Sequence, residues 1–344
     1  MYSFNDIYKG RTVLVTGHTG FKGSWLSLWL SMLGAKVIGY SLPPSTEPNH
    51  YELLKLWERI SLFSVFDNIG TERVPVLPGD PEIVFHLAAM AIPVKSFDNP
   101  PEVIRSNVLG TANILEACRR CKSVKAVVMI TTDKVYESKE WGWGYRENDN
   151  LGGDDPYSMS KVCAEHVIRC YRKQFLPQIA TARAGNVIGG GDWTYMRLIP
   201  DIARATAEGR PVEIYTPRAT RPWQHVLEPL SGYLRLGQLL FEGNDVASEW
   251  NFGPEGEMTV LEIVEEAKKA WGKVEYVIHE KETHPSMTRL LKLDSTRSKK
   301  ELGWEPRWNM RMGVWMAMNW YKNYYEKGQI NSEEDIDSYT YQVS

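Results

Sequence analysis

Residues 12–23 read TVLVTGHTGFKG, and this stretch gives the first indication of the fold. The first five form a short apolar run typical of a buried strand, and residues 24–34 carry apolar side chains at helical spacing. Between them, Gly17, Gly20 and Gly23 follow a Gly-x-x-Gly-x-x-Gly spacing. Glycines between a strand and a helix let backbone amides approach a diphosphate at the helix N-terminus, so this stretch predicts a dinucleotide-binding turn.

The alternation of strand and helix continues downstream. Further strands are expected near residues 37–40, 83–87, 126–130 and 179–183, with helices near 101–120 and 157–174. Continuous apolar strands that alternate with helices predict an α/β fold, a doubly wound parallel sheet of the Rossmann type with helices on both faces.

A change of pattern after Asn186 predicts a smaller, second lobe. Later elements are shorter and richer in Pro and Arg, whereas Trp250-Asn251-Phe252-Gly253 resembles a strand that returns to the first sheet. We therefore expect three parts: a dinucleotide-binding domain over residues 1–186 with a return segment at about 223–253, a substrate-binding lobe over 187–222 and 254–330, and a loosely held polar tail over 331–344.

Composition excludes several classes of protein. The 344 residues are 43% hydrophobic and 24% charged, with a net charge of −3, so neither a disordered chain nor a nucleic-acid-binding protein is expected. No apolar run reaches the length of a membrane span, and residues 1–11 do not resemble a secretion signal. We expect a cytoplasmic protein without a metal site, whose four cysteines are reduced thiols: Cys118, Cys121, Cys163 and Cys170.

Candidate catalytic residues cluster at two places in the sequence. Tyr157 and Lys161 stand four residues apart in an expected helix, a spacing that directs both side chains to one face. A cation beside a phenol lowers the phenol pKa from about 10 toward neutrality, so Tyr157 is expected to act as a base toward an alcohol. Thr132, Asp133 and Lys134 follow an expected parallel strand, at the end where such sheets bind ligands. Thr132 can hydrogen-bond the same hydroxyl, and the acid and the cation are candidates for proton transfer.

The residues after the second strand leave the choice between NAD and NADP open. Residues 40–44, YSLPP, stand where an acid would hold a ribose 2′-hydroxyl, and no Arg is present for a 2′-phosphate. Because no cation stands there, we expect NAD. Histidines at strand ends are more often structural, so His18 and His86 are not assigned to catalysis.

Four segments together resemble the extended short-chain dehydrogenase/reductase family, and within it the CDP-D-glucose 4,6-dehydratases. They are GHTGFKGSW at 17–25, TDKVYE at 132–137, RAGNVIGGGDW at 183–193 and RPWQHVLEP at 221–229. The likeness covers about residues 4–325.

The resemblance implies a CDP-hexose or related nucleotide-sugar substrate, tightly held NAD, and a reaction without net redox change. C4 would be oxidised, water eliminated across C5 and C6, and hydride returned to C6. Tyr157 would be the C4 base, Lys161 its partner and a ribose ligand, and Thr132 the C4-hydroxyl contact. Asp133 would protonate the departing C6 hydroxyl, and Lys134 replaces a Glu that is usual in dTDP-glucose and GDP-mannose dehydratases.

The resemblance also implies two sets of binding residues and an assembly. The cofactor set is Gly17, Thr19, Gly20, Phe21, Lys22, Gly23, Asp67, Asn68, Leu87, Ala88, Ala89, Thr131, Tyr157 and Lys161. The substrate set is Asn186, Arg197, Leu198, Arg221 and His225, in which the Arg side chains suit phosphate oxygens. The helices at 101–120 and 157–174 resemble the pair that builds a homodimer interface in this family.

The chain departs from the family pattern in three places. Residues 65–69, VFDNI, replace a Gly-Asp-Ile-Arg-Asp segment whose Asp meets adenine. Residues 90–95, MAIPVK, replace a Gln-Pro-Leu-Val-Arg-Arg-like run beside the sugar, and residues 284–287, HPSM, replace a His-Glu-Ala-His-like run. These changes bear on the identity of the substrate.

Lys134 can act in two ways. A neutral lysine at pH 7 costs roughly 4.6 kcal/mol, because the ordinary pKa is about 10.4. Burial and a nearby positive charge would make Lys134 the base for the C5 proton, which is the hypothesis we favour; alternatively, it stays a cation and stabilises the enolate.

Two other functions compete with dehydration. A nucleotide-sugar 4-epimerase would share the Tyr/Lys pair and NAD, but it needs no acid such as Asp133 for a C6 hydroxyl. A non-catalytic dinucleotide-binding protein would not need Thr132, Tyr157 and Lys161 together.

Overall fold

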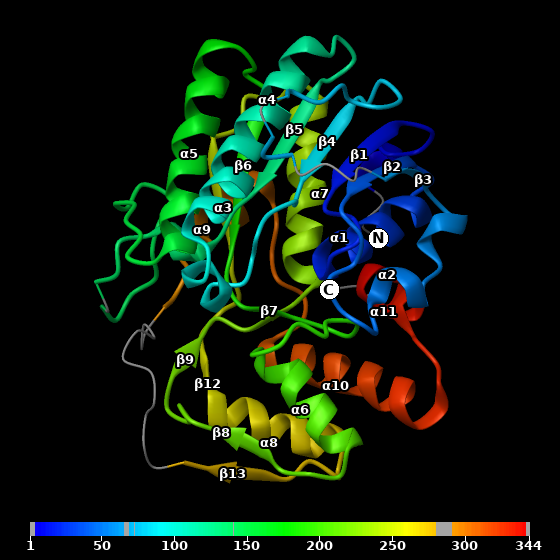
Figure 1. Ribbon diagram of the computed structural model, residues 1–344, viewed down its shortest axis with the longest axis vertical. Coiled ribbons are helices and arrows are strands. Elements are labelled where there is room, and N and C mark those ends of the chain that lie inside the picture. The colour runs from blue at the N-terminus through cyan, green and yellow to red at the C-terminus, as the bar shows by residue number, and fades with distance from the viewer. Residues whose placement is uncertain (1–3, 65–68, 72, 140, 280–290, 342–344) are drawn as a thin grey trace.

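A seven-stranded parallel sheet organises the larger part of the molecule (Figure 1). The computed structural model describes residues 4–64, 69–71, 73–139, 141–279 and 291–341. In sheet order the strands are β11 (Glu249–Phe252), β6 (Ile179–Ala184), β5 (Ala126–Ile130), β4 (Ile83–His86), β1 (Thr12–Thr16), β2 (Lys36–Ser41) and β3 (Ser61–Ser64). The order reverses direction between β4 and β1, the topological switch point where such sheets bind ligands. The predicted doubly wound sheet is confirmed.

Helices cover both faces of this sheet (Figure 1). On one face lie α1 (Phe21–Met32) and α7 (Leu227–Phe241), and on the other α4 (Gly110–Arg120) and α5 (Pro156–Gln174). Successive strand residues point to opposite faces, so Val13 and Val15 belong to the first core while Leu14 belongs to the second. This two-sided burial explains why the strands are apolar runs without a polar alternation.

The smaller lobe lies beyond the carboxyl ends of the strands, in the lower half of Figure 1. Its helices are α6 (Leu198–Ala207), α8 (Val260–Ala270) and α10 (Met310–Lys327). Its strands form three pairs: β7 (Val187–Ile188) with β10 (Gln224–His225), β8 (Val212–Ile214) with β13 (Tyr276–Ile278), and β9 (Thr220–Arg221) with β12 (Met258–Thr259). Between these segments the chain goes back to the large sheet, where β11 pairs with β6. The predicted return strand is confirmed.

Short elements complete the fold. They are η1 (Phe4–Asp6), α2 (His50–Leu53), η2 (Leu56–Glu58), η3 (Val94–Phe97), α3 (Pro100–Ile104), η4 (Arg105–Leu109), η5 (Asp133–Val135), α9 (Thr296–Leu302) and α11 (Ser332–Tyr341). The expected helix at 101–120 is therefore continuous only through the π-helical turn η4, which joins α3 to α4. In the part of the chain that the structure describes, no helix is long and apolar enough to cross a membrane.

The prediction of a loosely held tail is wrong for residues 332–341. They form α11, which packs on α1, and bury Ile336 and Tyr339. The hydroxyl of Tyr339 donates to the buried carboxylate of Glu228 at 2.7 Å, and the hydroxyl of Ser332 bonds His50 Nε2 at 2.8 Å. Ile336 and Tyr339 are only two of the ten residues of α11, a pattern too sparse to show this packing in the sequence.

The bond between Tyr339 and Glu228 generates a stability prediction. Burial raises the pKa of Glu228 to about 7, and the donors of Tyr339 and of the Trp308 and Arg307 backbones oppose that rise. Tyr339→Phe removes one donor from a buried carboxylate, so we expect the free energy of unfolding to fall by about 1–3 kcal/mol. The loss should be larger at pH 8, where the carboxylate is charged, than at pH 5, where it is protonated.

Urea denaturation at the two pH values measures this loss. Tyr341→Phe is the matched control, because Tyr341 is on the same helix but is 59% exposed. Equal stability of the two variants at pH 8 would contradict the assigned role of Tyr339.

Candidate active site

The predicted site residues meet where the sheet strands end and the smaller lobe begins. Because β1, β4, β5 and β6 are parallel neighbours, their carboxyl ends share one edge of the sheet. The glycine turn follows β1, residues 87–89 follow β4, residues 131–134 follow β5, and Asn186 follows β6. Tyr157 reaches the same edge because α5 starts there, with Asp155 as its N-cap accepting a hydrogen bond from Ser158 N at 2.9 Å.

The turn between β1 and α1 has the shape of a diphosphate cradle. Gly17 has a φ of 73°, and a Cβ there would lie 2.8 Å from Ala88 N. A Cβ on Gly23 would lie 2.0 Å from the carbonyl oxygen of Gly17, so neither position accepts a side chain. No side chain caps the start of α1 at Gly20. The backbone amides of the first turn are therefore available to an anion, and these residues fit the predicted dinucleotide.

Hydroxyl groups tie this turn to the neighbouring strand ends. Thr16 Oγ1 accepts from Leu87 N at 3.1 Å and Ala88 N at 3.2 Å. Thr19 Oγ1 donates to the carbonyl of Leu42 at 2.8 Å and lies 2.8 Å from Ser41 Oγ. A neutral serine thus stands at the end of β2, in line with the expectation of NAD. Asp67 and Asn68 lie outside the described residues.

His86 and His18 are enclosed by the fold. His86 Nδ1 bonds Thr16 Oγ1 at 2.8 Å, and burial, with the charge of Lys161, lowers the pKa of His86 to about 3. Burial also lowers the pKa of His18 to about 4. Both rings are neutral at physiological pH, in keeping with their interpretation as structural residues.

Tyr157 and Lys161 lie one helical turn apart and are both buried. Lys161 Nζ donates to the carbonyl of Ile130 at 3.4 Å. Burial lowers the pKa of Lys161 to about 8, against the effect of the Glu165 carboxylate. Burial also raises the pKa of Tyr157 to about 12, although a hydrogen bond with Thr132 opposes this. The predicted fall of the phenol pKa is therefore wrong for the protein by itself, because desolvation outweighs the neighbouring charges.

Thr132 and Asp133 form the second half of the constellation. Thr132 Oγ1 donates to Asp133 Oδ1 at 3.0 Å. Asp133 is 4% exposed, and within the described residues its Oδ2 accepts no hydrogen bond. Burial raises the pKa of Asp133, while the charges of Lys134, Arg221 and Lys22 and the bond from Thr132 oppose the rise. A buried carboxyl with one open oxygen is suited to hold a proton and to donate it.

Lys134 is exposed, contrary to the premise of the base hypothesis. Its backbone N donates to Thr132 Oγ1 at 3.3 Å, as part of the short turn η5. The burial on which the base hypothesis depends is therefore absent. The charge of Lys134 nevertheless reaches Asp133, so the role as a cation remains available.

Positive groups surround Asp133 at the junction of the two lobes. Arg197 stands at the start of α6 and donates to Asp192 Oδ2 at 2.9 Å, which fixes its direction. Burial, with the charges of Arg197 and Lys161 and against that of Asp133, lowers the pKa of Lys22 to about 8. Arg221 acts on Asp133 as well. Several cations near one acid favour an anionic ligand such as a diphosphate.

The other predicted substrate residues are placed differently. Asn186 follows the carboxyl end of β6, and Leu198 is the first residue of α6, next to Arg197; both are half-buried. His225 is not directed to this group: its ring is enclosed, with its centroid 6.0 Å from that of Trp25 and 5.0 Å from that of Trp308. Burial lowers the pKa of His225 to about 3, so it is a neutral core side chain.

Sequence reasoning missed three buried polar residues that support the site. Asn107, in the π turn, donates to Met90 O at 3.1 Å and Ser160 Oγ at 2.9 Å, which joins the loop after β4 to α5. Arg183 and Glu165 form an ion pair at 2.9 Å between β6 and α5. The sequence signals that could have revealed them are a polar Asn107 within an apolar helical stretch and a charged Arg183 within an apolar strand.

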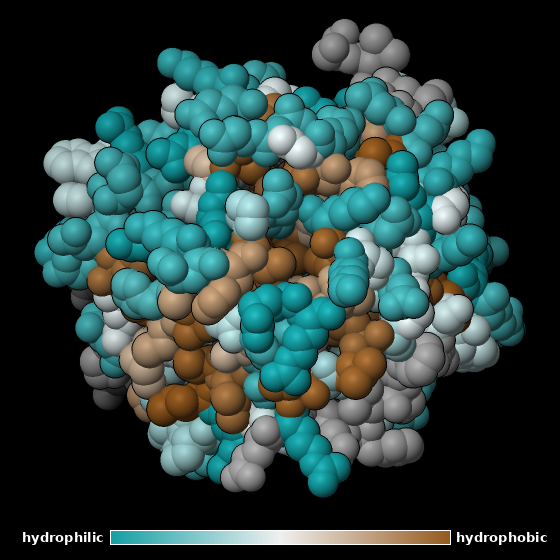
Figure 2. All heavy atoms as spheres, turned by 90° about the horizontal axis from the view of Figure 1, so that it is seen from above, coloured by the Kyte–Doolittle hydropathy of each residue, from teal (hydrophilic) through white to brown (hydrophobic). Residues whose placement is uncertain are grey.

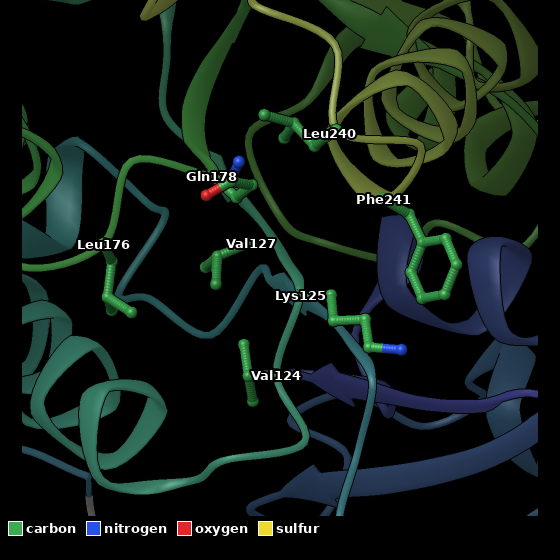
Figure 3. A pocket seen from close by; sticks show the side chains of 8 residues that line it. Val124, Lys125, Val127, Leu176, Gln178, Leu240 and Phe241 are labelled. Carbon is green, nitrogen blue, oxygen red and sulfur yellow. The ribbon is translucent and has the colours of Figure 1, made fainter.

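A hollow of about 340 Å³ lies at the opposite end of the sheet (Figure 3). Val124, Lys125, Leu176 and Phe241 are among its lining residues, at the amino ends of β5 and β6. This end of the molecule faces the viewer in Figure 2, where hydrophobic residues gather near the centre inside a hydrophilic rim. Its lining residues include no Asp, Glu or His side chain, so the chemistry is assigned to the carboxyl edge instead.

The described residues contain no group of three or more His, Cys, Asp or Glu side chains placed to hold a metal ion. Cys118 and Cys121 are free, and Cys121 Sγ lies 3.1 Å from Ser123 Oγ.

Comparison with known proteins identifies relatives over nearly the whole chain. The sequence profile of the GDP-mannose 4,6 dehydratase family matches residues 14–317. The chain is 43% identical over 349 aligned residues to a CDP-glucose 4,6-dehydratase of Salmonella typhimurium, and the alignment covers 97% of each protein.

Solved structures share the fold. An epimerase of Methanothermobacter thermautotrophicus superposes with a TM-score of 0.80 at 26% identity, covering 95% of this chain and 96% of that one. A dTDP-glucose 4,6-dehydratase of Bacillus anthracis in complex with NAD superposes with a TM-score of 0.74 at 24% identity, covering 92% and 98%.

The cradle generates a binding prediction. Gly23→Ala places a Cβ against the carbonyl of Gly17, so we expect loss of NAD binding in calorimetry, whereas Gly20→Ala, whose Cβ would lie 3.3 Å from the same atom, should weaken binding less. Gly272→Ala is the control, because a Cβ there meets nothing within 4 Å. Wild-type affinity in Gly23→Ala would place the dinucleotide elsewhere.

Proposed function

Because the chain belongs to the GDP-mannose 4,6-dehydratase family, we propose that it is an NAD-dependent 4,6-dehydratase that converts CDP-D-glucose to CDP-4-dehydro-6-deoxy-D-glucose. One observation carries this proposal. Thr132, Asp133 and Tyr157 are buried together at the end of β5. One edge of the sheet therefore holds a base and a hydrogen-bonding hydroxyl for an alcohol, Tyr157 and Thr132, and a proton-donating acid, Asp133. The 43% identity with a CDP-glucose 4,6-dehydratase supports both the reaction and the nucleotide.

The glycine turn between β1 and α1 is the proposed binding site of the NAD diphosphate. Gly17, Gly20 and Gly23 leave the first amides of α1 to the diphosphate, and Lys161 is proposed to hold the nicotinamide ribose. When bound there, NAD would supply the hydride acceptor for C4 and the hydride donor for C6.

Tyr157 removes the proton of the C4 hydroxyl as the C4 hydrogen departs as hydride. Thr132, already bonded to Tyr157 in the protein, orients that hydroxyl. The ammonium of Lys161 remains charged up to a pH near its pKa of about 8, and its charge favours the phenolate form of Tyr157. The 4-keto group that results makes the C5 proton acidic.

Asp133 provides the proton for the second step. Its raised pKa keeps the carboxyl protonated more readily than an exposed aspartate, and its open Oδ2 is the atom from which the proton passes to the departing C6 hydroxyl. The C5 proton passes to a carboxylate, either that of Asp133 once it has given up its own proton or that of Glu137, and the protonated C6 hydroxyl leaves as one water. After hydride reaches C6, a proton returns to C5, and the balance is a dehydration without net redox change.

The diphosphate of the substrate is proposed to lie among Arg197, Arg221 and Lys22. Arg197 is directed by Asp192, and the arginine fork suits two phosphate oxygens. Asn186 and Leu198 are proposed to line the same site, whereas we now assign His225 to the core.

A nucleotide-sugar 4-epimerase is the second candidate, because a solved epimerase shares the fold at a TM-score of 0.80. An epimerase oxidises and reduces C4 and leaves C6 untouched. Asp133, buried with an open oxygen beside Thr132, favours dehydration.

Mass spectrometry separates these functions. We expect the enzyme with NAD to remove one water from CDP-D-glucose, and to do so faster than from dTDP-, UDP- or GDP-glucose. An unchanged mass with a changed C4 configuration would establish the epimerase. Binding of NAD without either reaction would establish a non-catalytic dinucleotide-binding protein.

A prediction for Lys134 follows from its exposure and from its charge near Asp133. We now favour the cationic role, in which Lys134 stabilises the enolate that forms at C4 and C5. Lys134→Ala should still form bound NADH from CDP-D-glucose, while exchange of the C5 hydrogen with deuterated solvent slows by about 10- to 100-fold. Lys134→Arg, which keeps the charge but cannot act as a base, should retain most of the exchange.

Lys125→Ala is the control, since Lys125 immediately precedes β5 at its opposite end. Exchange lost equally in the Ala and Arg variants would restore the role of Lys134 as the base. Exchange that survives in both would direct the search to Asp133 and Glu137.

We also propose a homodimer formed through α3, α4 and α5. Ile104 and Leu109, at the ends of α3 and η4, are exposed although both are large and apolar. A symmetric four-helix contact would cover them. We expect light scattering to give a dimer at micromolar concentration and a monomer for Leu109→Glu. Val277→Glu, an equally exposed position in the smaller lobe, should remain a dimer, and a monomeric wild type would refute the proposal.

We propose that the two lobes bind different ligands. The domain at residues 1–186, with the return segment at about 223–253, would hold NAD, and the lobe at 187–222 and 254–330 would hold the sugar nucleotide. The four free cysteines suit a reducing, cytoplasmic setting.

A further inference from the structure

A fully enclosed ion pair lies directly behind the proposed active site. Arg183 of β6 and Glu165 of α5 have side chains that are 2% and 3% exposed. Arg183 Nε and Nη2 donate to the two carboxylate oxygens of Glu165, each at 2.9 Å. The pair is bidentate, the geometry that holds two side chains most rigidly.

The pair holds both ends of the segment that carries Thr132 and Asp133. At one end, the hydroxyl of Thr131 donates to Glu165 Oε1 at 2.6 Å. At the other end, Arg183 Nη1 donates to the hydroxyl of Tyr136 at 2.9 Å. Segment 131–136 is thus attached at each end to one ion pair.

Further bonds connect the pair to the loop before α5. Arg183 Nη1 also donates to the carbonyl of Glu147 at 3.1 Å, and the hydroxyl of Tyr136 donates to Asn251 Oδ1 at 2.7 Å. All these groups are buried. Packed apolar side chains would give similar stability without the desolvation of two charges, so stability alone does not account for the pair.

Glu165 is also one turn along α5 from Lys161. Its carboxylate raises the pKa of Lys161 against the effect of burial. Arg183 and the hydroxyls of Thr131 and Thr181 keep Glu165 ionised: they lower its pKa although burial raises it. The negative charge is therefore present at the pH of the reaction.

We propose that Glu165 and Arg183 are positioning residues, which align Thr132 and Asp133 with Tyr157 and hold the charge of Lys161 in place. Neither touches the substrate; both act through neighbouring residues. Only the effect on reaction rate rests on the proposed function, because the protonation of Lys161 can be measured without substrate.

The groups that face this arrangement come from several elements. Lys161 is acted on by Glu165 of its own helix and in turn affects His86 of β4 and Lys22 of α1. Glu165 faces Arg183 and Thr181 of β6 and Thr131 after β5. Of these, His86 is neutral at physiological pH, so the charge that opposes the effect of burial on Lys161 is that of Glu165.

The first test is the titration of Lys161 by NMR in protein labelled with ¹³C at lysine Cε, without NAD or substrate, the signal being assigned by its loss in Lys161→Arg. We expect a midpoint near pH 8 in the wild type and about pH 7 in Glu165→Gln. Glu165→Gln leaves Arg183 unpaired, so the charge-balanced Glu165→Gln/Arg183→Met variant is measured as well, with the same fall expected.

Glu116→Gln is the control, because Glu116 of α4 is paired with Arg119 and Arg120 on the surface. A midpoint that stays at the wild-type value in the folded double variant would overturn the link between Glu165 and Lys161.

The second test concerns alignment and uses neutral substitutions. Thr131→Val removes the bond to Glu165, so we expect the rate of bound NADH formation from CDP-D-glucose to fall about tenfold with KM unchanged. Thr131→Ser keeps the hydroxyl and should restore the rate. Equal rates in the Val variant and the wild type, or equal losses in Val and Ser, would refute the positioning role. If the wild type forms no NADH, the proposed function fails, while the titration still decides the charge link.

Discussion

Backbone contact at the turn between β1 and α1 constrains the rest of the molecule. The carbonyl of Gly17 lies so close to Gly23, and the backbone of Ala88 so close to Gly17, that no side chain fits at either glycine. This contact sets the angle between the first strand and the first helix, and it brings the end of β4 against the end of β1. Thr16 Oγ1 then bonds Leu87 N, Ala88 N and His86 Nδ1, so the ends of β1 and β4 are held together at one edge of the sheet. The same contacts shape the glycine turn that would bind a diphosphate and hold the strand ends next to the catalytic residues.

Desolvation dominates the chemistry at that edge. Burial raises the pKa of Tyr157 to about 12, lowers that of Lys161 to about 8 and raises that of Asp133. Each change disfavours a charged form, and each is opposed by a specific neighbour: Thr132 for the phenol, Glu165 for the ammonium, Lys134 for the carboxyl. The protein alone therefore holds a neutral phenol that needs further positive charge before it can act as a base, and a carboxyl that retains its proton more readily than usual. These are the protonation states expected of a dehydratase before NAD and substrate bind.

The second lobe depends on a chain that crosses between layers. After β6 the chain leaves the sheet at Asn186, returns at β11, and leaves again, and α11 finally packs on α1. Glu228, buried at the start of α7, accepts hydrogen bonds from the Trp308 and Arg307 backbones and from Tyr339. One carboxylate thereby joins the sheet domain to the last two segments of the chain.

The sequence alone determined the periodic part of this protein. Apolar runs predicted the strands β1, β2, β4, β5, β6 and β11, the glycine spacing predicted the cradle, and the four-residue spacing of Tyr157 and Lys161 placed both on one face of α5. These features depend on residues close in the chain. The tertiary structure alone decided that Lys134 is exposed, that His225 lies between Trp25 and Trp308, that α11 is packed, and that Arg183 pairs with Glu165. Burial and hydrogen bonding in these cases come from elements distant in sequence, and no local pattern records how much water a side chain loses when the layers close over it.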